Sequence, residues 1–453
     1  MNGNREPGLS RRTLLVGALG LGSAAALRVD AAGPGEDWPQ WRGPTRDGVW
    51  KETGLIEKFA GAELPLRWRA PISGGYSGPT VADGRVFVTD RVLDPKEQER
   101  THCFDWQTGK ALWAHTYDVS YRGVGYDVGP RACVTVHDGR AYAFGAVGHF
   151  HCYEAATGKV LWGHDLGRQY PIRLLDEPRP FWGISGAPLI EKDLVIVHLG
   201  GKPDACLVAF DRKTGAERWR ALQDRGSYSA PVLVEQAGKR VLLCWTGDNV
   251  VGLDPQTGKT HWAQPFPARQ VVIAIATPVV RKNLVFLTSF YEGSLMLRLG
   301  QDRLTAERVW ERRGQNERST DALHSIISTP FMTTEGGKDY VYGVDSYGEL
   351  RCLDALTGNR LWEDQTATPR DRWSTIHFVP NGNRVWMFNE RGQLLITRVS
   401  SRGFQELSRA QLLRPTMGQL PQRGGVCWSH PAFAYRHVFA RNDNELVCAS
   451  LAG

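Results

Sequence analysis

The stretch Asp254-Pro-Gln-Thr-Gly-Lys-Thr-His-Trp262 decides the fold, because close copies of it recur along most of the chain. In each copy the Asp ends one strand and accepts hydrogen bonds from turn amides, and the Gly takes the positive φ of a tight hairpin. The next strand carries the Trp, which seals the interface between neighbouring repeats. Clear copies end at Trp113, Trp162, Trp219 and Trp362, and eroded copies end at Trp310 and Leu407.

The spacing of these marks predicts the architecture. The Trp positions and their equivalents recur at intervals of 43 to 57 residues, from Trp68 to Leu407. A repeat of this length is typical of a solenoid or a propeller. Short alternating apolar runs, such as residues 84–89 and 283–288, lie between the marks without helical periodicity. Four short strands per repeat predict the blade of an all-β propeller.

The two ends of the repeat region predict the number of blades. After Leu407 the sequence has three strand-like runs but no closing Gly-to-Trp strand, whereas Leu66-Arg-Trp68 has a strand and a Trp with no hairpin before it. We therefore expect the N-terminal strand to complete the last blade, which closes the ring and hides the sheet edges. The prediction is an eight-bladed β-propeller over residues 66–453, preceded by an irregular arm over residues 32–65 with aromatic anchors.

The first 31 residues are predicted to be an export signal. Ser10-Arg-Arg-Thr-Leu-Leu15 resembles the twin-arginine signature, and the apolar segment up to Leu27 is too short and weak for a stable membrane span. Small residues before position 31 fit cleavage there. We expect a monomeric periplasmic protein, exported by the twin-arginine route, with no transmembrane segment in the mature chain.

Composition describes a globular chain, with a hydrophobic fraction of 42% and 16 Trp. The formal net charge is +7, and no dense basic run with interleaved aromatics supports nucleic-acid binding. Four cysteines share one repeat position with Ala209 and Gly252, which predicts small buried packing residues and not disulfides: Cys103, Cys152, Cys352 and Cys448. The pairing of four others stays open: Cys133, Cys206, Cys244 and Cys427.

A candidate site follows from the segments that open the innermost strands. Most of them carry a Ser-x-Pro pattern, as in Tyr76-Ser-Gly-Pro79. Strands in this slot line the central channel of a propeller, so we expect one set of residues to converge at its mouth: Tyr76, Arg131, Trp182, Tyr228, His377, Trp428 and His430. Either these residues end the inner strands and fill the funnel, or Arg131 and its neighbours form a pocket for a small anionic or quinone-like ligand.

Arg131 distinguishes the two interpretations, because a buried arginine needs a carboxylate or a bound anion. Asp127 is the nearest candidate partner in the sequence. The pair His149-Phe-His151 lies on one face of a strand, but no carboxylate or third His accompanies it. We therefore predict surface histidines there and no metal site.

The repeated Asp-x-x-Thr-Gly-Lys-x-x-Trp unit resembles the pyrroloquinoline-quinone-type propeller repeat. Quinoprotein alcohol dehydrogenases share this repeat with the propeller lipoprotein of the outer-membrane β-barrel assembly machinery. The resemblance covers nearly all of the mature chain, and it implies an eight-bladed propeller of quinoprotein type. Asp37-Trp-Pro-Gln-Trp-Arg-Gly-Pro44 also resembles exported quinone-repeat-like propellers of planctomycete-type bacteria. The same repeat serves enzymes and scaffolds, so the resemblance indicates the fold more than the activity.

The resembling dehydrogenases have adjacent cysteines in a vicinal disulfide, a calcium site of Glu, Asn and Asp, and often a Cys-x-x-Cys-His haem motif. This sequence has no Cys-Cys pair and no such haem motif. It also lacks the Gly-x-Ser-x-Gly and His-Glu-x-x-His motifs of hydrolases. We predict no catalytic residue and no cofactor, with pyrroloquinoline quinone left open.

The expected function is a non-catalytic binding or assembly scaffold in the cell envelope, with an envelope protein or a small anionic ligand as its partner. The alternative is a quinone-dependent oxidoreductase that acts on alcohols or sugars.

Overall fold

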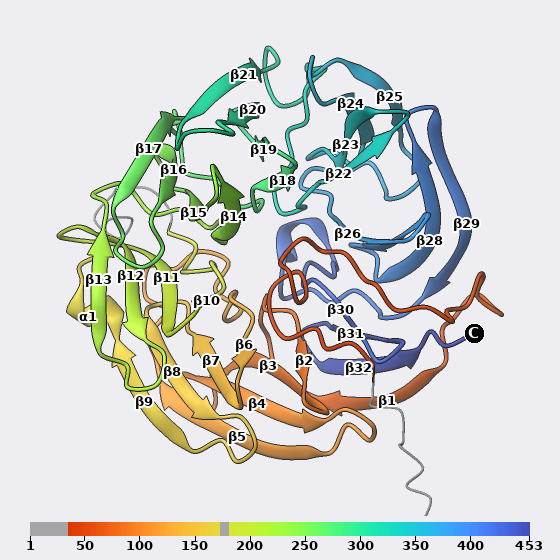
Figure 1. Ribbon diagram of the computed structural model, residues 1–453. Coiled ribbons are helices and arrows are strands. Elements are labelled where there is room, and N and C mark those ends of the chain that lie inside the picture. Colours follow the sequence, from red (N-terminus) through yellow and green to blue (C-terminus); the bar gives the residue numbers. More distant parts are fainter. Residues whose placement is uncertain (1–34, 173–180) are drawn as a thin grey trace, which may run out of the picture. The chain divides into compact units, whose positions relative to one another are not determined.

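The computed structural model describes residues 35–172 and 181–453. The predicted signal peptide, residues 1–31, lies outside the described residues. Within these described residues the chain forms eight antiparallel four-stranded sheets, and in seven of them the strands follow the chain order. Figure 1 shows these sheets arranged one after another around a ring, from orange through green to blue. The predicted eight-bladed β-propeller is confirmed.

The first four blades cover residues 80–265. Blade 1 has β2 (Thr80–Ala82), β3 (Arg85–Val92), β4 (Gln98–Asp105) and β5 (Ala111–Asp118). Blade 2 has β6 (Thr135–His137), β7 (Arg140–Phe144), β8 (His149–Glu154) and β9 (Val160–Asp165), followed by the short helix α1 (Leu166–Gln169). Blade 3 has β10 (Leu189–Glu191), β11 (Leu194–Gly201), β12 (Ala205–Asp211) and β13 (Glu217–Ala221). Blade 4 has β14 (Val232–Gln236), β15 (Lys239–Trp245), β16 (Asn249–Leu253) and β17 (Thr260–Pro265).

The other four blades complete the ring. Blade 5 has β18 (Val279–Arg281), β19 (Leu284–Ser289), β20 (Gly293–Leu299) and β21 (Ala306–Arg312). Blade 6 has β22 (Phe331–Glu335), β23 (Lys338–Val344), β24 (Leu350–Asp354) and β25 (Arg360–Asp364). Blade 7 has β26 (Ile376–Asn381), β27 (Arg384–Asn389), β28 (Gln393–Ser400) and β29 (Gly403–Gln411), followed by the 3-10 turn η2 (Pro421–Arg423). Blade 8 has β30 (Ala432–Ala434), β31 (His437–Arg441), β32 (Glu445–Ser450) and β1 (Leu66–Pro71).

Strand β1 confirms the predicted closure. It pairs antiparallel with β32, and Trp68 faces Cys448 across the two strands. The outermost strand of the last blade therefore comes from the N-terminal side of the chain. Because this pairing joins the two ends of the propeller by backbone hydrogen bonds, blade 8 does not leave the edge of β32 open.

Neighbouring blades are joined through the repeat unit. Trp113 of blade 1 lies against Gly158 of blade 2, and its Nε1 donates to the carbonyl oxygen of Ala155 at 3.0 Å. A Cβ at Gly158 would lie 2.5 Å from the Trp113 ring, and the residue has φ of 76°. Glycine is thus required both by the turn and by the ring above it. The same contact joins Trp68 to Gly109, Trp162 to Gly215, Trp219 to Gly258 and Trp310 to Gly358.

The cysteines occupy buried positions in the blades, as the repeat predicts for four of them. Cys103, Cys152 and Cys352 lie opposite the tryptophans of their own blades, Trp113, Trp162 and Trp362. A small side chain there leaves room for the indole ring. Among the four cysteines left open by the sequence, Cys133, Cys244 and Cys427 are free and buried. Cys206 is buried with Sγ 3.6 Å from Nε2 of His198.

Residues 35–65 form no regular strand, and they bind blades on different sides of the ring. Trp50 is fully buried against Trp386 and Phe433, with ring centroids at 5.7 Å and 5.1 Å. Arg46 is buried and donates to the carbonyl oxygens of Ala187 and Pro188 at 3.2 Å and 3.0 Å. The arm, red in Figure 1, therefore connects blades 7 and 8 to blade 3. None of the helices in residues 35–172 and 181–453 has the length and apolar character needed to cross a membrane.

Candidate ligand site at the centre of the ring

A pocket of about 380 Å³ lies where the innermost segments of the blades converge. The segment that precedes the inner strand of most blades carries the Ser-x-Pro pattern described above. In an extended chain, alternate residues point to the same side. The position three residues before the inner proline, or its equivalent, contributes Tyr76, Arg131, Ser185, Tyr228, Ile275, Ile327 and Trp428 to the lining. The position one residue before it contributes Cys133, Ala187, Ala230, Thr277 and His430. The pocket is therefore built from two layers of equivalent positions.

The structure brings together all seven residues that the sequence places at the channel mouth. Tyr76, Arg131, Trp182, Tyr228, His377, Trp428 and His430 line this one pocket. Trp182 reaches it from the segment before blade 3, where its backbone N–H donates to the hydroxyl of Tyr228 at 3.2 Å. Their role as ligand-binding residues stays a prediction.

Trp41 is a lining residue that the sequence analysis placed only on the arm. Its Nε1 donates to Oγ1 of Thr277 at 2.7 Å, and its ring meets His430 edge-on with centroids 4.5 Å apart. Trp41, His377 and His430 also line a second cavity of about 30 Å³ beside Arg42. These three rings therefore separate the two cavities and form the wall of the pocket on the side of the arm.

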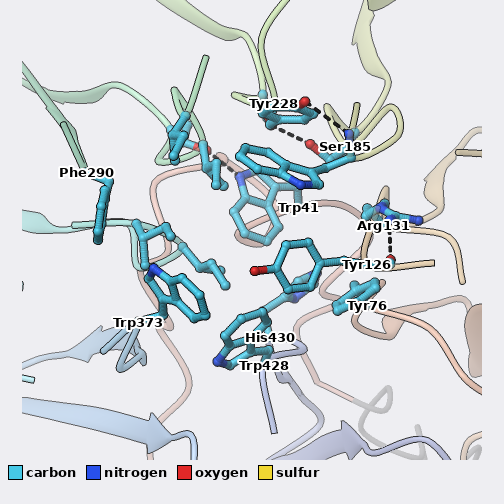
Figure 2. A pocket seen from close by; sticks show the side chains of 18 of the residues that line it. Trp41, Tyr76, Tyr126, Arg131, Ser185, Tyr228, Phe290, Trp373, Trp428 and His430 are labelled. Atoms are coloured by element: carbon cyan, nitrogen blue, oxygen red, sulfur yellow. Dashed lines mark hydrogen bonds between the residues drawn. The ribbon is translucent and has the colours of Figure 1, made fainter. Parts of the chain in front are cut away.

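Sequence reasoning also missed four rings on loops: Tyr126, Phe290, Tyr291 and Trp373. Tyr126 lies between β5 and β6, and Trp373 lies between β25 and β26, with φ of 51° and 69°. Both pack in one apolar cluster with Trp428 and Leu420. Figure 2 shows Tyr126 with its hydroxyl directed toward the middle of the pocket. These four residues lie on loops outside the repeat, so the spacing of the repeat does not predict where their side chains lie.

Arg131 binds backbone carbonyl groups and does not pair with Asp127. Its guanidinium donates to the carbonyl oxygens of Gly125, Tyr126 and Gly129, and it lies over the Tyr76 ring at 5.0 Å. Asp127 instead has Oδ2 at 3.8 Å from Nη1 of Arg91. The proposed Asp127–Arg131 pair is therefore wrong. The left-handed conformation at Tyr126 curls this loop so that its carbonyl groups, and not the carboxylate, face the guanidinium.

The two imidazoles of the pocket are neutral. Nε2 of His377 donates to the carbonyl oxygen of Trp428 at 2.8 Å, and Nδ1 of His430 lies 3.4 Å from the carbonyl oxygen of Pro431. Burial lowers the pKa of His377 to about 4 and the pKa of His430 to about 3. Near pH 7 both rings are therefore uncharged, because removing a cationic imidazole from water is unfavourable. The described residues that line the pocket include no Asp or Glu.

The other histidine pair is part of an interface between blades. His149 packs against Tyr117 and His151 packs against His115, with centroids 5.0 Å and 5.2 Å apart. Within residues 35–172 and 181–453, no group of three or more His, Cys, Asp or Glu side chains is placed to hold a metal ion. The prediction of surface histidines is therefore wrong, because both rings are half-buried in the aromatic packing between blades 1 and 2.

Eight four-stranded blades, a Trp-to-Gly contact between neighbours and a central pocket of aromatic rings define a propeller of the pyrroloquinoline-quinone-like class. The family model described as outer membrane protein assembly factor BamB matches residues 97–312 and 207–451. The chain belongs to this family. No curated protein matches the chain.

Solved structures share the fold at low identity. BamB from Moraxella catarrhalis is 16% identical with a TM-score of 0.57, over 85% of this chain and 99% of that one. Quinohemoprotein alcohol dehydrogenase from Comamonas testosteroni is 14% identical with a TM-score of 0.63, over 92% of this chain and 81% of that one. A europium-containing methanol dehydrogenase is 14% identical with a TM-score of 0.59, over 91% of this chain and 90% of that one. The neighbours thus include an assembly factor and dehydrogenases.

Proposed function

We propose that the protein is an exported, non-catalytic propeller that acts as a binding or assembly scaffold in the cell envelope. The observation that carries this proposal is the chemistry of the central pocket. Arg131 is the one charged side chain among the lining residues, and backbone carbonyl groups hold its guanidinium. Two neutral imidazoles and a wall of aromatic rings complete the lining. Imidazoles with a pKa this low are weak bases, and the lining residues include no carboxylate, so the lining favours binding over acid–base catalysis.

The alternative, a quinone-dependent oxidoreductase acting on alcohols or sugars, needs a different set of residues. Pyrroloquinoline quinone carries three carboxylate groups, which need cationic or N–H partners when they leave water. Calcium needs six to eight oxygen ligands, most of them carboxylates and amide or backbone carbonyls. The lining residues offer Arg131 as a cation and include no Asp, Glu or Asn. The residues present therefore do not fit this cofactor.

The outer surface of the ring supports a scaffold role. One residue before the Trp of the repeat unit, three blades carry a leucine on their outermost strand: Leu112 on β5, Leu161 on β9 and Leu361 on β25. They are 46%, 37% and 47% exposed. We propose that these exposed leucines, each on the outermost strand of its blade, are contact points for other proteins. The family match and the twin-arginine signature both favour a place in the cell envelope.

The test is reconstitution of the purified protein with pyrroloquinoline quinone and calcium, followed by a dye-linked assay on alcohols and sugars. The scaffold proposal predicts no turnover above the protein-free control. Robust turnover that depends on both additions would overturn it. In parallel, proteins cross-linked to the wild type in a periplasmic extract are compared with those cross-linked to the L112S/L161S/L361S variant. Specific partners that the variant loses would support the proposal that these three leucines contact other proteins.

A further inference from the structure

We propose that the central pocket binds a small, uncharged, planar molecule of about two fused aromatic rings that carries a hydrogen-bond acceptor, gripped between Tyr126 and Trp373. This ligand site is independent of the scaffold role proposed above. It also replaces the anionic ligand expected from the sequence, because the structure assigns a different task to Arg131.

The size and the walls of the pocket set the first requirement. Its volume of about 380 Å³ lies in the range of small-molecule pockets, roughly 300–1,000 Å³. It is more than twice the cavity of about 150 Å³ that binds benzene in an engineered protein core. Rings of Trp, Tyr and Phe line it from the arm, from the inner strands and from the loops. A flat aromatic molecule meets such walls by offset stacking or edge-on contact.

The backbone at two of the rings gives a second, independent observation. Tyr126 and Trp373 both have positive φ, a conformation that is unfavourable for a bulky side chain. Such strain persists where the surroundings enforce it, and it gathers at ligand-binding positions. Arg131 donates to the carbonyl oxygen of Tyr126, and the N–H of Trp373 donates to the carbonyl oxygen of Ser346 at 2.6 Å. Two separate loops thus present an aromatic ring to the same pocket from strained positions.

The hydroxyl of Tyr126 sets the polarity of the ligand. Its oxygen accepts from Nε2 of Gln422 at 3.4 Å, and Figure 2 shows it directed into the pocket. Burial raises the pKa of Tyr126, so the group keeps its proton at neutral pH. Within the described residues no acceptor is bonded to this O–H. A ring nitrogen or carbonyl oxygen on the ligand would accept from it.

The charge of the site sets the last requirement. Arg131 donates three hydrogen bonds to carbonyl oxygens of its own loop, and both pocket histidines are neutral. An ammonium entering this pocket would lose its hydration without an anionic partner. A carboxylate would meet Arg131 as its one cationic partner, and three carbonyl oxygens already engage that guanidinium. The site therefore selects neutral rings over charged ones of the same shape.

Four probes with one ring skeleton test this selection by titration calorimetry and tryptophan fluorescence: quinoline, naphthalene, 2-naphthoate and N-methylquinolinium. We expect quinoline to bind one-to-one, naphthalene about fivefold more weakly because it lacks the acceptor, and the two ions at least tenfold more weakly. Tyr126→Phe should reduce quinoline binding to the level of naphthalene and leave naphthalene unchanged. Tyr340→Phe, in β23 outside the pocket, is the matched control and should bind like the wild type.

A variant that fills the pocket with a larger side chain tests where the probes bind. Ile327→Trp should abolish binding of quinoline and naphthalene, and Ala230→Leu serves if the first variant unfolds, as judged by circular dichroism. Tighter binding of 2-naphthoate than of quinoline would overturn the proposal in favour of an anion site. Quinoline binding that survives both Tyr126→Phe and the filling variant would also overturn it, as would no binding of any probe. Turnover plays no part in these readouts, so they are separate from the test of the scaffold role.

Discussion

Nε1 of Trp68 donates to the carbonyl oxygen of Trp106 at 2.8 Å, and this bond ties blade 8 to blade 1. Trp68 lies on β1, which also pairs with β32, so one short strand makes both contacts that close the ring. We predict that a protein lacking residues 32–70 exposes the edge of β32 and loses the seal between blades 1 and 8. Its melting temperature should fall, and size-exclusion chromatography should show association. A truncated protein that melts at the wild-type temperature and stays monomeric would rule this out.

The contact between tryptophan and glycine in neighbouring blades predicts a matched pair of variants. Gly158→Ala places a Cβ 2.5 Å from the Trp113 ring, whereas Gly139→Ala meets no atom within 4 Å, and both positions have positive φ. The strained turn alone should cost about 1–2 kcal/mol at either site. The displaced ring should add about 1–3 kcal/mol at Gly158 alone. Chemical denaturation measures both values, and equal losses would show that the ring does not constrain the turn.

Arg131 is predicted to stabilise its loop. Arg131→Ala removes three hydrogen bonds to the carbonyl oxygens of Gly125, Tyr126 and Gly129. We expect a loss of about 2–3 kcal/mol in the free energy of unfolding. Asp127→Ala is the control, because this carboxylate is 69% exposed beside Arg91 and should change stability by less than about 0.5 kcal/mol. An unaltered melting temperature for Arg131→Ala would contradict the structural role.

The buried histidines predict how stability depends on pH. Folding lowers the pKa of His377 to about 4 and of His430 to about 3, so between these values and about 6.5 the unfolded chain binds more protons. Their contribution is present above pH 6.5 and is lost as pH falls toward the folded pKa. Between pH 7 and pH 5 each should account for about 2 kcal/mol. His377→Gln and His430→Gln should each flatten the dependence measured by denaturation, and a slope equal to that of the wild type would contradict the assignment.

Much of this molecule follows from periodicity. The repeat predicts the blade, the count of eight and the closing strand, because Asp, Gly and Trp have fixed tasks in a hairpin that packs on a copy of itself. It also predicts the positions of Tyr76, Tyr228 and Trp428, because equivalent residues of a ring converge at its centre. Local repetition is therefore sufficient to place residues that lie on the repeat.

The rest of the site depends on segments outside the repeat. Tyr126 and Trp373 reach the pocket only because loops between blades adopt positive φ, and no pattern of residue types encodes that turn. Trp41 reaches it because the arm folds back on Thr277, which lies far away in the sequence. The Asp127–Arg131 pair failed for the same reason, since proximity in the chain did not determine which groups face the guanidinium. Tertiary packing decides all three.

We propose that the middle of this propeller binds a small molecule and is not a quinone centre. Calorimetric titration of the protein with pyrroloquinoline quinone in the presence of calcium tests it most directly. We predict no saturable heat, because the pocket has one cation, already held by backbone carbonyl groups, and no carboxylate for the metal. One-to-one binding of the quinone that requires calcium and disappears in Ile327→Trp would contradict the claim.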